Sequence, residues 1–143
     1  MRVFPFIFCF VLLALSCNKK VTNGDGMSTS ECEAVIISNS IFQELEPNQA
    51  AISELSIEDD CLTLMLGFGG CDADHTFKMI SDGGIAESLP VQITFDFQDE
   101  KPQDCKAYFE IETQFDLSPI RDLIEDDIII RFRNSDRSIL YVK

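Results

Sequence analysis

The sequence predicts an all-β domain built as an antiparallel two-sheet sandwich. Three observations predict it: apolar and polar residues alternate along several short runs, turn-forming residues separate those runs, and no long stretch has the period of an amphipathic helix. Short strands without helical crossovers favour two packed antiparallel sheets over one parallel sheet. We expect this domain to occupy residues 32–143.

Three runs show the two-residue period most clearly. Apolar side chains alternate over residues 62–68 and 91–97, and a third run over residues 107–115 has a polar outer face. Shorter strands are expected over residues 34–38, 52–57, 76–81, 128–133 and 139–142. Together these runs make about eight strands, which is typical of an immunoglobulin-like sandwich.

Turn signals lie between the runs, at residues 58–60, 69–70, 82–84, 99–102 and 134–136. One helical turn is expected from Ser118 to Leu123, with Ser118 as the cap and Pro119 at the first helical position. The alternation predicts a core formed by Leu62, Leu64, Leu66, Val91, Ile93, Phe95, Phe109, Ile111, Phe115, Leu117, Ile128 and Ile130.

The N-terminus has the pattern of an export signal. A single cation, Arg2, precedes an apolar run from Val3 to Leu15, and Ser16 and Cys17 follow. The run is too short to span a bilayer. A small residue directly before a cysteine resembles the signal of bacterial lipoproteins, which implies that residues 1–16 are removed and that Cys17 is lipidated.

Residues 17–31 are expected to be a flexible tether, because residues 18–30 are polar and offer almost nothing to bury. The membrane would then be reached through lipid on Cys17. The formal net charge of −14 and the scattered basic residues exclude a nucleic-acid partner, which requires clustered cations. No cofactor motif is present, and none is expected to bind.

Six cysteines are present, of which Cys9 belongs to the signal and Cys17 to the lipidation site. The remaining four suit a disulfide framework in an oxidising compartment, and three pairings are possible. We favour Cys71 with Cys105 and Cys32 with Cys61. A zinc site is disfavoured because the spacing contains no Cys-x-x-Cys pair.

The best candidate for chemistry is the segment 69–75, which gathers Asp72, Asp74 and the single histidine, His75. These side chains could hold a metal ion or transfer protons. A structural role is preferred, because Gly-Gly and Asp are turn formers and Cys71 can fasten the loop. No Gly-x-Ser-x-Gly elbow is present. The acidic clusters 58–60 and 125–127 lack the spacing of a calcium loop, so solvated turns are preferred there.

Several segments together resemble small uncharacterised lipoproteins of the Bacteroidota. They are Asp60-Cys61-Leu62-Thr63-Leu64, Gly69-Gly70-Cys71-Asp72, Ala86-Glu87-Ser88-Leu89-Pro90, Cys105-Lys106-Ala107, Phe115-Asp116-Leu117-Ser118-Pro119-Ile120-Arg121 and Ile139-Leu140-Tyr141. The resemblance covers most of residues 52–143 and implies a β-sandwich-like lipoprotein of the cell envelope, without an activity to carry over.

Surface-exported lipoproteins of such bacteria look acidic just after the lipidated cysteine, whereas Lys19 and Lys20 stand here. This difference indicates an outer-membrane anchor facing the periplasm. The functional expectation is a non-enzymatic binding module with an envelope protein as its partner. The alternative is a metal-binding protein or metal-dependent enzyme centred on Asp72, Asp74 and His75.

Overall fold

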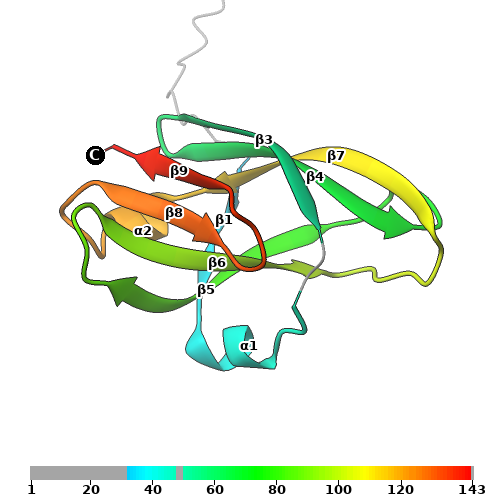
Figure 1. The fold of residues 1–143 in the computed structure, drawn as a ribbon, viewed down its shortest axis with the longest axis horizontal. Coiled ribbons are helices and arrows are strands. Elements are labelled where there is room, and N and C mark those ends of the chain that lie inside the picture. The colour runs from blue at the N-terminus through cyan, green and yellow to red at the C-terminus, as the bar shows by residue number, and fades with distance from the viewer. Residues whose placement is uncertain (1–31, 48–49, 143) are drawn as a thin grey trace, which may run out of the picture.

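The computed structural model describes residues 32–47 and 50–142, which form two β-sheets packed face to face (Figure 1). The expected signal peptide (1–16) and tether (17–31), with Cys17, lie outside the described residues. One sheet has the order β1-β7-β4-β3, formed by β1 (Glu33–Ala34), β7 (Ala107–Asp116), β4 (Cys61–Gly70) and β3 (Ala51–Glu58). The other has the order β2-β5-β6-β8-β9, formed by β2 (Ile36–Ile37), β5 (Phe77–Ala86), β6 (Val91–Asp99), β8 (Ile128–Phe132) and β9 (Ser138–Tyr141). The predicted two-sheet sandwich is confirmed.

The strand pairing is mixed, which departs from the expected antiparallel, immunoglobulin-like arrangement. β1 pairs with β7, β2 with β5, and β6 with β8, all in parallel. The cause is that the chain changes sheets. It leaves β6 for β7 in the opposite sheet and returns through α2 (Ser118–Arg121) to enter β8 from the end where β6 began. Such a crossover is what a parallel pair requires.

The core lies between the sheets and follows the predicted alternation. All of the predicted core residues are buried except Val91, Phe109 and Ile111, which are partly exposed and still pack against the core. Cross-strand neighbours bring apolar side chains to the same face, for example Leu66 opposite Ile111 in β4 and β7. The period of two in the sequence therefore identified the inward faces of both sheets.

Two helical segments complete the fold. α1 (Asn39–Glu44) was not predicted; the Ser38 hydroxyl accepts a hydrogen bond from the backbone N–H of Ile41, and Phe42 is the buried residue of the helix. α1 packs against β5, below the strands in Figure 1. α2 was predicted, but its N-cap position is Leu117 rather than Ser118, whose hydroxyl donates to Asp116.

Two glycine-containing turn signals lie inside strands. Gly69 and Gly70 pair with Tyr108 and Ala107, so β4 continues through them. β5 continues to Ala86 because a bulge absorbs residues 82–84, where Gly83 has a φ of +79°. No helix in residues 32–47 or 50–142 is long and apolar enough to cross a membrane.

Candidate functional site

Two disulfides fasten opposite ends of β4. Cys61 opens the strand and is bonded to Cys32, whereas Cys71 follows its last residue and is bonded to Cys105. The Cα–Cα distances are 6.1 Å and 4.8 Å, within the usual range for disulfides. This is the pairing favoured from the sequence. At about 3.3 Å per residue, the ten-residue strand separates the two bridges by about 30 Å.

The loop after β4 carries the residues that were singled out for chemistry. The side-chain carbonyl of Gln103 accepts hydrogen bonds from the backbone N–H groups of Cys71, at 2.6 Å, and Asp72, at 3.3 Å. Asp74 forms an ion pair with Lys101, with 2.9 Å between Oδ2 and Nζ. The loop is therefore held to the segment before β7 by a disulfide, an amide and an ion pair.

His75 is buried at the inner side of this loop, with 7% of its surface exposed. Its ring centroid lies 4.4 Å from that of Phe68, and its Nδ1 lies 2.7 Å from Oδ2 of Asp99. The other ring nitrogen, Nε2, lies against Gly70, where an added Cβ would be 2.7 Å away. The carboxylate thus orients the imidazole, and Gly70 leaves room for it.

The three residues of the alternative metal set, Asp72, Asp74 and His75, are not brought together. Asp72 accepts a hydrogen bond from the backbone N–H of Asp74, both aspartates are exposed, and His75 faces Asp99 instead. Within the described ranges, no group of three or more His, Cys, Asp or Glu side chains could hold a metal ion. The reason is the direction of the chain after the loop: His75 turns inward two residues before β5, while the aspartates remain exposed in the loop.

Sequence reasoning missed Asp99 as the partner of His75. The sequence places this residue in a turn signal at 99–102, and its side chain does accept a hydrogen bond from the backbone N–H of Lys101, at 2.8 Å. In the β5–β6 hairpin, Phe77 pairs with Asp99, which places the carboxylate beside the residue two positions before Phe77. The register of the β5–β6 hairpin is therefore the signal that identifies Asp99 as the partner of His75.

An open groove of about 310 Å³ lies beside the His75–Asp99 pair. Aromatic rings, carboxylates and an amide line it: Ala50, Phe68, Gly69, Phe77, Asp99, Gln103, Asp104 and Cys105. In hydrolytic triads Nε2 of the histidine meets a nucleophile. In the part of the chain that the structure describes, Nε2 of His75 has no hydrogen-bond partner. The groove offers contact surface and hydrogen-bond acceptors.

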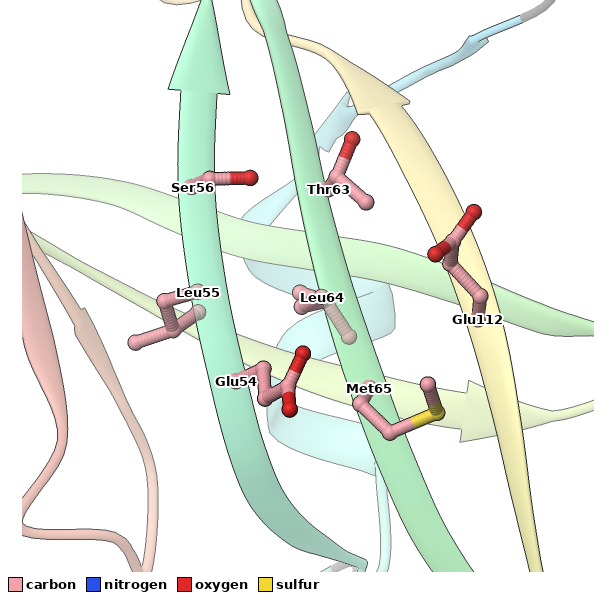
Figure 2. A pocket seen from close by; sticks show the side chains of 7 residues that line it. All are labelled: Glu54, Leu55, Ser56, Thr63, Leu64, Met65 and Glu112. Carbon is pink, nitrogen blue, oxygen red and sulfur yellow. The ribbon is translucent and has the colours of Figure 1, made fainter.

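A second, smaller hollow of about 150 Å³ lies on the outer face of the β3-β4-β7 sheet. Figure 2 shows its lining side chains, with Glu54 and Glu112 on the flanking strands and Met65 between them. The full lining is Glu54, Leu55, Ser56, Thr63, Leu64, Met65 and Glu112. This outer face is therefore acidic and shallow.

Asp60, in the acidic turn between β3 and β4, connects that turn to two other parts of the fold. Its carboxylate accepts the hydroxyl of Tyr141 and forms an ion pair with Arg121, whose Nη1 lies 2.6 Å from Oδ2. Burial, followed by the hydrogen bond to Asp60, raises the pKa of Tyr141 to about 12. This cluster joins the β3–β4 turn to α2 and β9.

Comparison with known proteins gives a fold but no family. No family model matches the chain, and no curated protein is significantly similar to it. A protein of unknown function, DUF1344, from Bacteroides vulgatus ATCC 8482 has a TM-score of 0.51 at 8% identity, over 78% of this chain and 55% of that one. A protein from Parabacteroides distasonis ATCC 8503, described as toxin-related, has a TM-score of 0.47 at 17% identity, over 77% of this chain and 57% of that one.

This chain spans little more than half the length of either structure. At 8% identity, the likeness to the Bacteroides vulgatus protein shows a shared fold alone, and a fold does not specify a function. A fold shared with an uncharacterised Bacteroides protein is in keeping with the resemblance of the motifs to uncharacterised proteins of the Bacteroidota.

Proposed function

We propose that the protein is a lipid-anchored interaction module of the cell envelope, held by lipid on Cys17 and binding a protein partner without catalysis. The observation that carries the proposal is the pair of disulfides in a small domain. Disulfides persist in oxidising compartments outside the cytoplasm. The apolar run that ends at Ser16 and Cys17 supplies the route of export.

The anchor determines where the module acts. One acyl chain gives only marginal membrane binding, at about 0.8 kcal/mol per buried methylene, whereas the two or three chains of a bacterial lipoprotein make release negligible. The motifs resemble small envelope lipoproteins, and Lys19 and Lys20 after the cysteine favour the periplasmic face of the outer membrane.

Replacing the acylation site tests the anchor. The Cys17→Ser variant is expected to be soluble in the periplasm or to keep its signal attached, whereas the wild type fractionates with the outer membrane. Membrane fractionation and intact mass of the purified chain distinguish these states. A correctly cleaved C17S protein that still sediments with membranes would contradict the anchor. Protease treatment of intact cells should spare the wild type if it faces the periplasm.

A binding role is favoured over catalysis by the geometry around His75. The imidazole is enclosed, and its Nε2 has no hydrogen-bond partner in the described part of the chain. In-cell crosslinking of the anchored wild type, followed by mass spectrometry, should repeatedly recover one discrete envelope protein. Recovery of no protein at all from a folded, anchored chain would contradict the interaction role.

A further inference from the structure

The two sheets end in four edges, and three of them are protected. β9 has only four residues. β3 carries a bulge between Ile52 and Leu55, and the guanidinium of Arg137 donates to the Ser53 carbonyl at 3.2 Å. The β5 edge is interrupted by β2 and by the bulge at residues 82–84, and α1 packs against it. Short edges, bulges and covering segments are the usual means of preventing edge-to-edge pairing.

The fourth edge, β7, is long and, within residues 32–47 and 50–142, open over most of its length. Its inner side pairs with β4 over all ten residues without a bulge. Its outer side pairs with β1 only at Phe115 and Asp116. Among the described residues, no strand pairs with Ala107–Gln114 on that side, which leaves about 25 Å of free edge. In Figure 1 this strand runs along the upper right of the molecule, away from α1.

The inward side chains of this edge are not fully covered by the described part of the chain. Phe109 and Ile111 lie opposite Phe68 and Leu66 on the core face, yet they remain partly exposed while those two partners are buried. Another strand beside β7 would cover them with its own inward side chains. Alternate side chains of that strand must therefore be apolar.

The outward side chains of β7 determine which charges a strand paired with this edge should carry. Glu110 and Glu112 project from the outer face, where Glu112 also borders the hollow in Figure 2, and both are exposed. Tyr108 covers Gly67 of β4 and so lies over the sheet. Opposite charges across paired strands stabilise them, and like charges oppose pairing. A second copy pairing through the same edge would bring these glutamates against its own.

We propose that Ala107–Gln114 of β7 is the docking edge for an extended strand of a partner protein, with Lys or Arg on its outer face and apolar residues on its inner face. The inference rests on the proposed interaction role and names its surface. Backbone hydrogen bonds along β7 supply the affinity, while Glu110 and Glu112 select the charge of the strand.

Peptide binding to the full chain in dodecyl maltoside tests the edge. The probe is a capped nine-residue peptide of alternating Lys and Val, and amide hydrogen exchange locates it. Protection is expected over residues 107–114, with binding that weakens as salt is raised. A matched peptide methylated at alternate backbone nitrogens, and a peptide of alternating Glu and Val, should each bind about tenfold more weakly.

Two charge variants provide the matched control. Glu110→Lys with Glu112→Lys should lose about tenfold in affinity for the Lys-Val peptide, whereas Glu125→Lys with Asp126→Lys, in the exposed turn before β8, should not. Equal binding of the methylated peptide, equal loss in both variants, or protection at another edge would overturn the proposal.

In-cell photo-crosslinking distinguishes the docking edge from the broader proposal that the protein is an interaction module. The crosslinking residue replaces either Tyr108 of β7 or Leu140 of β9. A partner crosslinked at position 108 supports the docking edge. A partner crosslinked only at position 140 leaves the interaction role standing and overturns the edge. Crosslinks at position 108 to a second copy, or to residues 18–31 of the same chain, overturn it as well.

Discussion

Tyr141 joins segments that are far apart in the chain. Its hydroxyl donates a hydrogen bond to the carboxylate of Asp60, which also forms an ion pair with Arg121. β9, the β3–β4 turn and α2 therefore meet at one carboxylate. The ring itself is buried in the core, with 1% of its surface exposed. The side chain therefore serves both the apolar packing and the polar closure of this end of the sandwich.

The Tyr141→Phe variant should lower the free energy of unfolding by about 2 kcal/mol near neutral pH, because it removes a hydrogen bond to a charged acceptor. Denaturant unfolding checks the value. An unchanged midpoint would contradict the contribution of the hydroxyl.

The same tyrosine should make wild-type stability depend on alkaline pH. Its pKa is about 12 when folded and about 10 when unfolded, so its contribution is complete below pH 10 and is lost as the pH rises to 12. Absorbance at 295 nm follows the titration, and the Y141F variant leaves Tyr108 as the single tyrosine to compare.

Gly70 provides the space that His75 occupies. A Cβ at this position would lie 2.7 Å from Nε2 of His75 and 3.2 Å from the carbonyl oxygen of Asp72. The Gly70→Ala variant should therefore cost about 1–3 kcal/mol through displacement of the ring. Gly69→Ala is the matched control, since its nearest atom would be 3.6 Å away, and it should change stability by about 0.5 kcal/mol or less. Equal midpoints for the two variants would show that the ring adjusts freely.

At the scale of elements, α1 packs against β5 and is also attached through Arg133, the residue that follows β8. The guanidinium carbon of Arg133 lies 3.9 Å from the ring centroid of Phe42, and its Nη2 donates to the Phe42 carbonyl at 3.4 Å. Its Nη1 lies 3.2 Å from Oδ2 of the buried Asp96. Arg133 thus holds the helix through a cation–π contact with Phe42, while its ion pair with Asp96 fixes the guanidinium in place.

The Arg133→Ala variant should cost about 3 kcal/mol, because a buried carboxylate loses its cation and α1 loses its attachment. Arg131 is the matched control, since it is exposed in β8, two residues before Arg133, and donates to Gln92 at 3.1 Å. Its alanine variant should change stability by less than about 1 kcal/mol. Faster exchange of the α1 amides in R133A alone would identify the attachment as the cause.

The elements that could be predicted are those with a complete hydrophobic period. β4, β6 and β7 fall where their alternation placed them, because each turns alternate apolar side chains toward the core over nine or ten residues. α1 has six residues and one buried side chain, too few to establish a helical period. The sequence predicts that this strand ends at Ser81, but tertiary pairing with β6 carries β5 through a bulge that Gly83 permits.

The candidate site was predicted only in its local part. Gly69 and Gly70 belong to β4 rather than to a turn, whereas Cys71 fastens the loop that follows through its bridge to Cys105, which is the favoured pairing. The His75–Asp99 contact depends on the β5–β6 register, which local patterns do not specify. The parallel pairing of β6 with β8 is likewise a property of the route between sheets.

For the whole molecule, the two disulfides should contribute similar stability. They close loops of sequence separation 29 and 34, so each should contribute about 3–4 kcal/mol in the chain-entropy model. Replacing either pair by serines, C32S/C61S or C71S/C105S, should lower the denaturation midpoint by comparable amounts. Peptide mapping under non-reducing conditions checks the pairing. A large inequality between the two double variants would show that strain or residual structure outweighs loop closure.

The bond between Cys32 and Cys61 also determines how a mechanical load from the N-terminal side enters the domain. Cys32 is the first residue that the structure describes, and β1 follows it at once. Without the bridge, tension would peel β1 from β7 and then β2 from β5, one hydrogen bond after another. With it, the load passes through the sulfur atoms into β4, which is paired on both sides, so many ladder bonds must shear together before the domain yields.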